Sequence, residues 1–372
     1  MMKLYETYST WVEVDLNSIS GNVASISQKT GVPVMAVVKA DAYGHGIIPV
    51  AGSVLENGGA SWLGVARIEE ALQLRDSGLE CPILVLGYSP AEKFSEAIAE
   101  DISLTFWNLE QLAIMEKIAE KVGKQVKVHL KVDSGMSRLG IQPEDVLGLV
   151  EKIIDFPEVL FEGVFTHFAR ADESDRSSTT GQELIFKEVL NSLVAAGACP
   201  PIVHAANSAA ALSQPTAYFN LVRPGIAIYG LEPSRDWSLP SSFKAALTWK
   251  AVISQVKMLP PGRGVSYGHE YVTKKNEHIG TIPVGYADGF RRIEGNQVLV
   301  RGTRVPVVGR VCMDQISVQL DGVPNAKAGD EVVILGKQGQ ETITAEEIAD
   351  RWGTINYEVV CGISGRVPRI YK

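Results

Sequence analysis

The alternation of short apolar runs with longer amphipathic stretches between residues 34 and 229 constrains the fold of this 372-residue chain most strongly. Eight runs have the composition of buried strands, and the stretches between them carry apolar residues at helical spacing. Eight β/α units predict an α/β fold, an eight-stranded parallel (β/α)8 TIM-type barrel. An open, doubly wound sheet is the alternative, although no Gly-x-Gly-x-x-Gly follows any run. The predicted strands are residues 34–39, 62–66, 82–87, 102–106, 126–133, 160–168, 202–207 and 221–229.

Two of the intervening stretches, residues 67–78 and 108–123, have the clearest helical pattern. Asn108 precedes the second stretch and is a suitable N-cap, because its side chain can accept a hydrogen bond from the first turn. Met115 is interpreted as a core residue. The apolar positions at helical spacing in this stretch are Leu112, Met115, Ile118, Ala119 and Val122.

After residue 240 the predicted strands follow one another closely and helical signals become sparse. This change predicts a mostly β C-terminal domain after the barrel. We expect a barrel domain over residues 12–239 and a β-rich domain over residues 240–372, with which residues 1–11 can pair. The predicted elements are strands at 251–257, 279–284, 297–300, 305–311, 316–319 and 331–335, and a helix at 344–352.

The composition excludes several classes of function. With 45% hydrophobic and 21% charged residues and a net charge of −8, the chain has no basic excess for nucleic acid. It contains no apolar stretch long enough for a membrane span, and its N-terminus lacks the apolar core of a secretion signal. The four cysteines lie far apart without metal-ligand spacing, so we expect small buried side chains and no metal site. A cytoplasmic location is expected.

The segment AVVKADAYGHG, residues 36–46, places Lys39 at the end of an apolar run and before a glycine-rich loop. A lysine at the end of a buried strand can be desolvated, which lowers the pKa of its amine and makes it a nucleophile or a base. A pyridoxal phosphate enzyme needs such a lysine for its Schiff base. The alternative is a surface lysine at a strand end.

Polar residues follow several of the predicted strands, and the carboxyl ends of barrel strands share one rim, where active sites lie. These residues include Lys131, Asp133, Arg138, His167, Asn207 and Arg223. Barrels commonly bind phosphate with the loops after strands seven and eight. Here these loops offer the hydroxyl of Ser208 and the backbone of Gly225 and Ile226, and Tyr43 adds a phenol. Ser208 as a helix N-cap and Gly225 in a plain turn are the alternatives.

Further segments resemble motifs of the alanine racemase family, in the family's order, and the likeness extends from about residue 14 to the C-terminus. Together with residues 36–46 they are highly specific. The resemblance implies an isomerase that uses pyridoxal 5'-phosphate and works as a head-to-tail homodimer with shared active sites. The segments are HLKVDSGMSRLG (129–140), HAANSAA (204–210), RPGIAIYG (223–230), GVSYGHEY (264–271), VGYADGFRR (284–292) and GRVCMDQ (309–315).

The resemblance implies catalytic roles for four residues. Lys39 would form the Schiff base and then act as the base on the D face of the substrate. Tyr267 of the partner subunit would be the base on the L face. A phenol is a poor base at neutral pH, so Tyr267 needs help, for which His167 is the implied neighbour. Arg223 would face the pyridine nitrogen, with His204 behind it.

Other residues are implied to bind the cofactor and the substrate. Arg138 would reach the phenolic oxygen of the cofactor and the substrate carboxylate, held by Lys131 if that lysine is carbamylated. Cofactor contacts are implied for Tyr43, Asn207, Ser208, Gly225, Ile226 and Tyr357. Met313 and Asp314 would line the substrate side from the partner chain. Tyr286, Arg292, Arg310 and Asp172 resemble entrance residues, whereas Arg170 departs from the family's smaller residue.

The function expected from these residues is interconversion of L-alanine and D-alanine by two-base α-proton transfer, supplying D-alanine for peptidoglycan. A racemase of serine or of basic amino acids is the alternative on the same scaffold. A pyridoxal phosphate decarboxylase of basic amino acids is a different class, against which Arg223 argues. A single-barrel binding protein for pyridoxal phosphate would leave the β-rich domain and Tyr267 unexplained.

Overall fold

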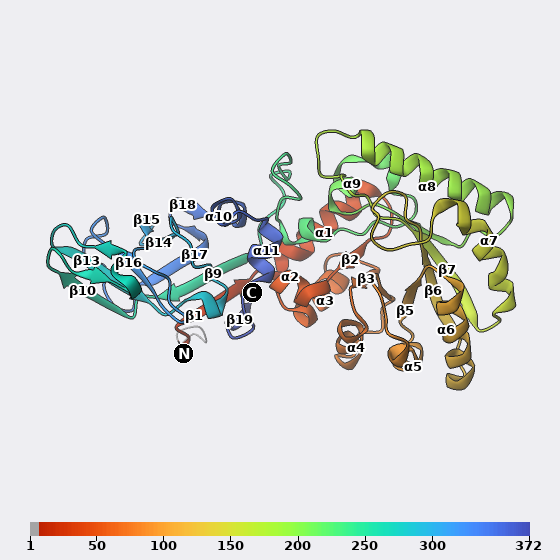
Figure 1. The fold of residues 1–372 in the computed structure, drawn as a ribbon, viewed down its shortest axis with the longest axis horizontal. Helices are drawn as coiled ribbons and strands as arrows, with labels where there is room; N and C mark the ends of the chain where they lie inside the picture. Colours follow the sequence, from red (N-terminus) through yellow and green to blue (C-terminus); the bar gives the residue numbers. More distant parts are fainter. Residues whose placement is uncertain (1–6) are drawn as a thin grey trace. The chain divides into compact units, whose positions relative to one another are not determined.

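The computed structural model describes residues 7–372, and these residues form two compact units (Figure 1). The barrel unit comprises Asn17–Ala42 and Gly46–Lys244. The β unit comprises Tyr43–His45, Ala245–Lys372 and the described residues up to Leu16. The boundary after residue 239 stays a prediction, and residues 1–6 of the segment expected to pair with the second domain lie outside the described residues.

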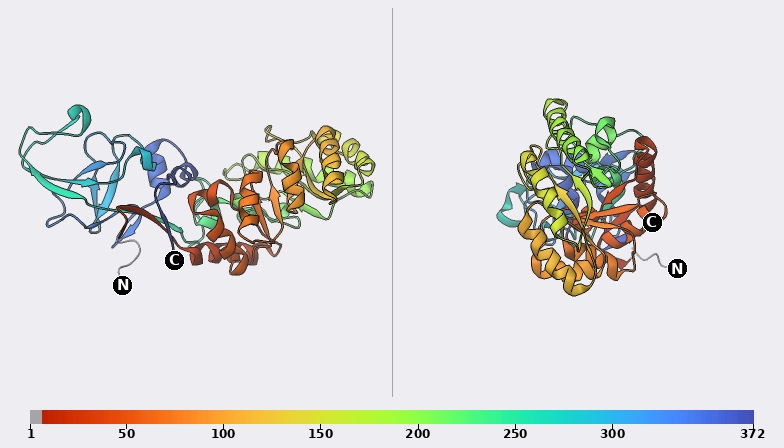
Figure 2. Two further views of the ribbon diagram at one scale, coloured as in Figure 1. Left: turned by 90° about the horizontal axis from the view of Figure 1, so that it is seen from below. Right: turned by 90° about the vertical axis from the view of Figure 1, so that its right-hand side faces the viewer.

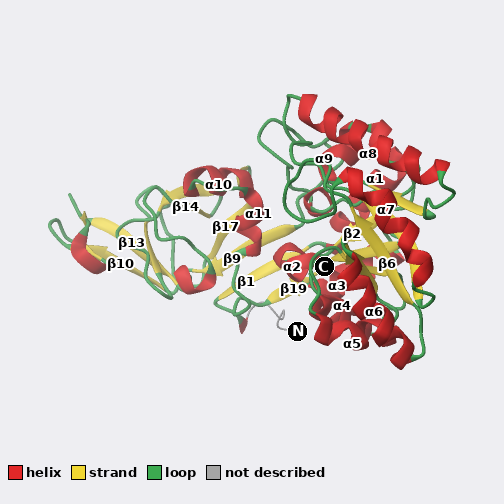
Figure 3. Cartoon of the chain, turned by 45° about the vertical axis from the view of Figure 1, so that its right-hand side comes forward, coloured by secondary structure: helices red, strands yellow, loops and turns green. Residues whose placement is uncertain are grey.

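The barrel unit contains a sheet of seven parallel strands that pair in chain order, each with the next. Most of their residues are buried, and helices cover the strands on the outside (Figure 3). The predicted α/β barrel fold with a following β-rich region is confirmed. The strands are β2 (Met35–Val37), β3 (Trp62–Val65), β4 (Ile83–Val85), β5 (Ser103–Phe106), β6 (Val126–Lys131), β7 (Val159–Phe165) and β8 (Ile202–His204).

The eighth position of the barrel is filled by isolated bridges rather than by the long strand predicted over residues 221–229. Leu221 bridges His204 of β8, and Val222 bridges Val34 beside β2. The length of the predicted strand is therefore wrong. Pro224 has no N–H to donate to a ladder, and the chain then enters a 3₁₀ helix, η6 (Ile226–Tyr229).

Helices lie around the strands of the barrel unit (Figure 2). The predicted cap of α6 is confirmed, because Asn108 accepts a hydrogen bond from the Gln111 N–H, and Met115 is buried as expected. The helices are α1 (Leu16–Thr30), α2 (Lys39–Gly44), α3 (Ile47–Glu56), α4 (Ile68–Asp76), η2 (Ala91–Lys93), α5 (Phe94–Ala99), α6 (Leu109–Val122), η3 (Pro143–Asp145), α7 (Val146–Val150), η4 (Glu151–Asp155), α8 (Ser177–Ala195), α9 (Ser208–Ser213) and η5 (Pro215–Ala217).

The β unit is built on a mixed sheet in the order β15-β14-β17-β9-β1-β19, with β18 paired to β17. A second sheet has the order β10-β13-β16, and β11 pairs with β12. The strands are β1 (Thr10–Val14), β9 (Leu247–Val252), β10 (Gln255–Leu259), β11 (Gly264–Val265), β12 (Tyr271–Val272), β13 (Glu277–Ile282), β14 (Gln297–Val300), β15 (Thr303–Pro306), β16 (Ile316–Gln319), β17 (Glu331–Gln338), β18 (Glu341–Ile343) and β19 (Arg369–Tyr371).

Four helical segments complete the β unit: η7 (Tyr267–His269), η8 (Tyr286–Asp288), α10 (Ala345–Trp352) and α11 (Asn356–Cys361). The single strand predicted over residues 251–257 is wrong, because this stretch belongs to the two strands β9 and β10. The expectation that all cysteines are buried is also wrong. Cys361 is exposed and the other three are half-buried, and none of these four described cysteines forms a disulfide. Within residues 7–372, no helix has the length and apolar character needed to span a membrane.

Candidate active site

Cationic side chains gather at the carboxyl ends of the barrel strands. Lys131 is the last residue of β6 and is 5% exposed. Burial lowers its pKa to about 8, and the positive charges of Arg223, Arg138 and Lys39 act in the same direction. Asp133 acts in the opposite direction. The structure thus brings four predicted cationic site residues into one electrostatic field.

Arg223 is only 4% exposed, and hydrogen bonds fix its guanidinium from several sides. Its Nη1 donates to His204 Nδ1 at 2.9 Å, and its Nη2 donates to the Thr166 carbonyl at 2.9 Å and to the Ala205 carbonyl at 3.1 Å. Nη2 also lies 3.4 Å from His167 Nδ1. Burial lowers the pKa of Arg223 to about 9, so the guanidinium keeps its charge at neutral pH. The side chain is a fixed cation.

A hydrogen-bond chain continues from Arg223 through the barrel interior. His204 Nε2 lies 2.9 Å from His129 Nδ1, and His129 Nε2 lies 3.1 Å from Glu162 Oε2, which also accepts from the Ser103 hydroxyl at 2.6 Å. Burial lowers the pKa of both imidazoles, so they are neutral near pH 7. Because an ionised carboxylate only accepts, His129 donates to Glu162, His204 donates to His129, and Arg223 donates to His204. One set of tautomers satisfies the whole chain.

His167 follows β7 and belongs to the same field. Burial lowers its pKa well below the usual value, and the charges of Arg223, Lys131, Arg138 and Lys39 lower it further. The imidazole is therefore neutral at physiological pH. It can accept a proton or a hydrogen bond without adding a further positive charge.

The loops after β8 and after the bridges meet at Ser208. Its buried hydroxyl oxygen accepts from the Gly225 N–H at 2.9 Å and from the Ala227 N–H at 3.2 Å, which leaves the hydroxyl hydrogen to donate elsewhere. The N-cap of α9 is Asn207, which accepts from the Ala210 N–H at 3.1 Å. Ser208 therefore ties the two loops together instead of capping the helix.

The residues after Lys39 form a helical turn of unusual hand. Left-handed helical conformation costs about 1–2 kcal/mol for each non-glycine residue and is rarely found in runs. Backbone strain of this kind persists where surrounding contacts hold the conformation in place, and it is found most often at functional sites. Asp41 provides one such contact, because its carboxylate accepts from the Ile47 N–H at 2.8 Å. The φ values are 55° for Ala40, 53° for Asp41, 52° for Ala42, 53° for Tyr43 and 78° for Gly44.

Tyr43 and Tyr357, both predicted to lie near the cofactor phosphate, contact each other within the β unit. Their ring centroids are 6.0 Å apart and the rings are tilted by 47°. Burial of Tyr43 raises the pKa of its phenol, and Tyr357 and Cys361 act in the same direction. The phenol of Tyr43 therefore stays protonated and is a hydrogen-bond donor.

Tyr267 stands on a strained turn of the β unit. Its neighbours Ser266, Gly268 and His269 have φ values of 64°, 73° and 46°. The Ser266 hydroxyl pins the turn by donating to the Arg310 carbonyl at 2.6 Å. The Tyr267 side chain is nevertheless 72% exposed. The turn fixes the backbone of Tyr267 while leaving its ring open to solvent.

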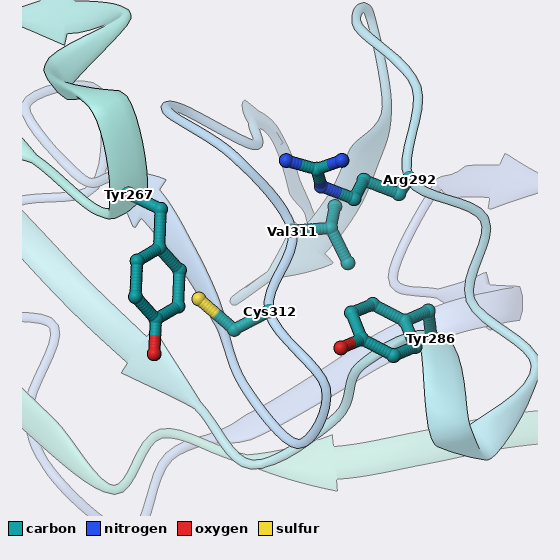
Figure 4. A pocket seen from close by; sticks show the side chains of 5 residues that line it. All are labelled: Tyr267, Tyr286, Arg292, Val311 and Cys312. Atoms are coloured by element: carbon teal, nitrogen blue, oxygen red, sulfur yellow. The ribbon is translucent and has the colours of Figure 1, made fainter.

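A pocket of about 350 Å³ lies beside this turn. Its lining includes Tyr267, Tyr286, Arg292, Val311 and Cys312, and Figure 4 shows the two tyrosines standing on either side of Cys312. The structure therefore places the predicted base Tyr267 next to two residues predicted for the entrance.

The segment with Met313 and Asp314 packs on the turn that carries Tyr286. The Met313 carbonyl accepts from the Ala287 N–H at 3.0 Å, while the Met313 side chain is 53% exposed. Asp314 pairs with Arg366 at 2.8 Å. Tyr267 and Met313 thus present apolar surface outward from neighbouring turns of the β unit.

Comparison with known proteins identifies the family. The family model of the alanine racemase N-terminal domain matches residues 14–233, and that of the alanine racemase C-terminal domain matches residues 246–371. This chain belongs to the alanine racemase family. The family predicted from the sequence motifs is confirmed, and the chain is an enzyme of that family.

Similarity to individual alanine racemases extends over almost the whole chain. Those of Methanococcus maripaludis and Halothermothrix orenii are each 46% identical, covering 98% of this chain and 99% and 97% of theirs. The alanine racemase structure from Clostridium difficile 630 superposes with a TM-score of 0.93 at 42% identity, covering 98% of this chain and 96% of that chain.

Sequence reasoning assigned no role to three residues of this alanine racemase family member. His129 and Glu162 extend the hydrogen-bond chain behind Arg223, and Glu70 contacts the residue after Lys39. A histidine within the apolar run of β6 is the signal that could have pointed to His129. Glu70 and Glu162 leave no comparable signal, because acidic residues are common in first helical turns and on partly exposed strands.

Arg170, the departure from the family pattern, forms a surface ion pair. It donates to Glu173 at 2.7 Å, and its side chain is 46% exposed. Arg310, one of the entrance residues, pairs with Glu270. Within residues 7–372, no group of three or more His, Cys, Asp or Glu side chains is arranged to hold a metal ion.

Proposed function

We propose that this chain interconverts L-alanine and D-alanine with pyridoxal 5'-phosphate as its cofactor, using Lys39 and Tyr267 as the two bases. The observation that carries the proposal is the group of Lys39, Lys131, Arg138 and Arg223 at the barrel rim. Alanine racemase is also the name of relatives that match nearly the full chain.

The charges at the rim fit a phosphorylated cofactor with an ionised phenol. Four cationic side chains meet there with Asp133 as an opposing charge, and His167 and His204 stay neutral. Such an excess of positive charge suits anionic groups of the cofactor and of an amino acid carboxylate. When bound, pyridoxal phosphate would hold the substrate covalently and stabilise the charge left by removal of the α-proton.

Lys39 would carry the proton on the D face. It follows a buried strand and shares the electrostatic field of Lys131, Arg138 and Arg223. Arg223 would face the ring nitrogen, with Nη1 and Nη2 already engaged by His204 and by carbonyls. A guanidinium keeps its protons, so the ring would be a weaker electron sink than one beside a carboxylate. Side reactions would be suppressed.

Arg138 would bind the phenolic oxygen and the substrate carboxylate, because its planar cation suits such oxygens. Lys131 would hold Arg138 if it carries a carbamate. A pKa of about 8 gives Lys131 a sizeable neutral fraction near physiological pH, and CO2 reacts with the neutral amine. Intact mass measured under CO2 should show one added CO2, absent in Lys131→Met; a spectrum with only free lysine contradicts the carbamate.

Tyr267 of the partner subunit would carry the proton on the L face, in a homodimer with shared active sites. An exposed phenol on a pinned turn, next to the exposed Met313, supports a surface that meets another copy. Met313 and Asp314 would border the substrate from there. His167, neutral and close to Arg223, would be the neighbour that helps the phenol to lose its proton.

The cofactor phosphate would bind at the loops joined by Ser208. The Ser208 hydroxyl has its hydrogen available to donate, and Tyr43 stays protonated beside Tyr357. The backbone of Gly225 and Ile226 and the side chain of Asn207 would complete this end. In the structure the Gly225 N–H donates to Ser208, so a phosphate would share that hydrogen.

We extend the proposal to the supply of D-alanine for peptidoglycan and to a cytoplasmic location, which both stay predictions. Serine and the basic amino acids are the alternative substrates, which the same scaffold would racemise with the same two bases.

The test is proton NMR of the protein with pyridoxal phosphate in D2O, with L-alanine, L-serine and L-lysine supplied separately and chirality assayed afterwards. Fast α-proton exchange and conversion to D-alanine, with little reaction of the others, is the expected result. Preference for serine or lysine would overturn the substrate and keep the two bases. Exchange without inversion would discard Tyr267 and leave Lys39.

A further inference from the structure

Glu70 joins the loops that follow two neighbouring barrel strands. Its Oε2 accepts from the Ala66 N–H at 2.8 Å and from the Arg67 N–H at 3.1 Å, at the start of α4. Its Oε1 accepts from the Ala40 N–H at 2.6 Å. One carboxylate therefore binds three backbone amides from both loops.

This contact lies where the strand ladder ends. β2 and β3 pair in parallel, with Val37 opposite Gly64, and the Val38 N–H donates to the Gly64 carbonyl at 2.9 Å. After Val38 the chain leaves the sheet and enters the left-handed turn. Glu70, which follows β3 in the chain, reaches back across the end of this ladder to Ala40.

The Ala40 N–H belongs to the peptide plane that begins at the Lys39 carbonyl. Fixing that plane fixes the ψ angle of Lys39 and with it the direction in which the lysine side chain leaves the backbone. Ala40 is also the first of the residues with φ near +55°, a conformation that an alanine does not favour. A charged acceptor at this amide offsets the strain where the turn begins.

We infer that Glu70 is a positioning residue, which aims the Lys39 amine by holding the Lys39–Ala40 peptide in the left-handed turn. A helix cap alone needs one carboxylate oxygen, which Oε2 provides. The second oxygen is used outside α4. The inference rests on the proposed function only for the claim that Lys39 is the reacting group.

The first measurement is amide hydrogen exchange of the full chain without cofactor. Ala40 is an exposed residue, so its amide should exchange freely unless Glu70 binds it. We expect protection of the Ala40 amide in the wild type. Exchange at the rate of an unstructured peptide would overturn the inference without any variant.

The second measurement uses Glu70→Gln, with Glu69→Gln as the matched control. An amide has one accepting oxygen, which keeps two hydrogen bonds by facing Ala66 and Arg67, so the Ala40 N–H is left opposite an NH2 group. Glu69 is exposed in the same first turn. We expect Ala40 exchange to rise roughly ten- to a hundredfold in Glu70→Gln, the range for one hydrogen bond to a charged group. The control should behave as the wild type.

The third measurement is borohydride trapping of pyridoxal phosphate on Lys39, with kinetics of the holoenzyme. Glu70→Gln should trap roughly tenfold more slowly and lose kcat more than KM for alanine changes. Equal trapping rates in wild type and Glu70→Gln would make Glu70 a helix cap only. A wild type that does not trap at Lys39 would instead refute the proposed function, so the two failures are distinct.

Discussion

In the barrel unit Arg223 is 4% exposed and donates to one imidazole and two carbonyls, whereas in the β unit Tyr267 is 72% exposed on a turn held by its neighbours. The first side chain is fixed by contacts of its own. The second has a fixed backbone and a solvent-exposed ring. The barrel rim is thus organised by contacts within one chain, whereas the Tyr267 ring is exposed to solvent, as the proposed role of Tyr267 in a partner's site requires.

The largest effect should come from Lys39→Ala, which removes the proposed base and attachment point at the barrel rim. We expect activity to fall by on the order of 10³ or more, because covalent attachment and proton transfer are both lost. The absorbance band of the covalently attached cofactor should disappear, which a spectrum of the purified variant would reveal. An unchanged band would refute the assignment, and exposed Lys29→Ala is the control.

Tyr267→Phe tests the other region of the comparison. We expect racemisation to fall by about 10²–10⁴-fold with the cofactor still attached, because a phenyl ring cannot carry a proton. In D2O, D-alanine should still exchange its α-proton without inversion, while L-alanine should not. Tyr88→Phe removes a phenol that is 62% exposed and should change nothing. Racemisation by Tyr267→Phe near the wild-type rate would refute the two-base account.

Lys131→Met tests how much the burial of Lys131 and the neighbouring cations lower the free energy of unfolding. The pKa of Lys131 is about 8 in the folded protein and near 10.5 in the unfolded chain, so the proton binds the unfolded state more tightly. The resulting penalty is fully present below pH 8 and shrinks as pH rises toward 10.5. The cofactor-free variant should be about 1–3 kcal/mol more stable at pH 7.

This gain should diminish above pH 8 in denaturant titrations at several pH values. The matched control Lys127→Met changes a lysine on the same strand that pairs with Asp101 at 2.6 Å. A gain in Lys131→Met that does not vary with pH would show that packing, not charge, causes it.

Glu162→Gln tests whether the order at the rim depends on the interior hydrogen-bond chain. Without the carboxylate, the His129 Nε2–H loses its charged acceptor, whereas Arg223, which can only donate, still fixes the tautomers of His129 and His204 from the other end of the chain. We expect kcat to fall by about tenfold, the effect of one misplaced hydrogen bond, with KM little changed. Nitrogen NMR of the imidazoles should show the same tautomers with a changed signal for His129 Nε2, and reversed tautomers would contradict the chain. Exposed Glu151→Gln is the control.

Arg170→Ala should have the smallest effect. The ion pair with Glu173 is exposed on both sides, and such pairs contribute little to stability because water and salt screen them. We expect thermal stability and kcat/KM for alanine to stay near wild-type values. A clear change in the preference between alanine and serine would instead assign Arg170 to substrate selection.

The barrel strands and the residues at their ends could be predicted because each buried parallel strand leaves an apolar run in the sequence. Lys131 and Arg223 were found by this rule. The eighth strand was predicted too long, since a run of apolar residues does not reveal that Pro224 stops the ladder.

Other features leave no local trace in the sequence. The left-handed turn includes Ala40 and Ala42, whose composition favours an ordinary helix, and its contact with Glu70 joins residues 30 positions apart in the sequence. The contact between His129 and His204 joins β6 and β8, which are not neighbours in the sheet, so neither local sequence reveals it. The sequence predicts which side chains lie at the rim, but it does not predict the contacts that fix their positions.

The position of β1 in its sheet affects how the chain folds while it is being synthesised. It lies between β9 and β19, with Thr10 opposite Ala251 and Val12 opposite Arg369. Residues 17–244 leave the ribosome first and can form their barrel before the strands that pair with β1 have been synthesised. Pairings so distant along the chain form slowly and leave an unpaired edge that other chains can join. Chaperones should therefore be needed most just before the last strand, β19, is released.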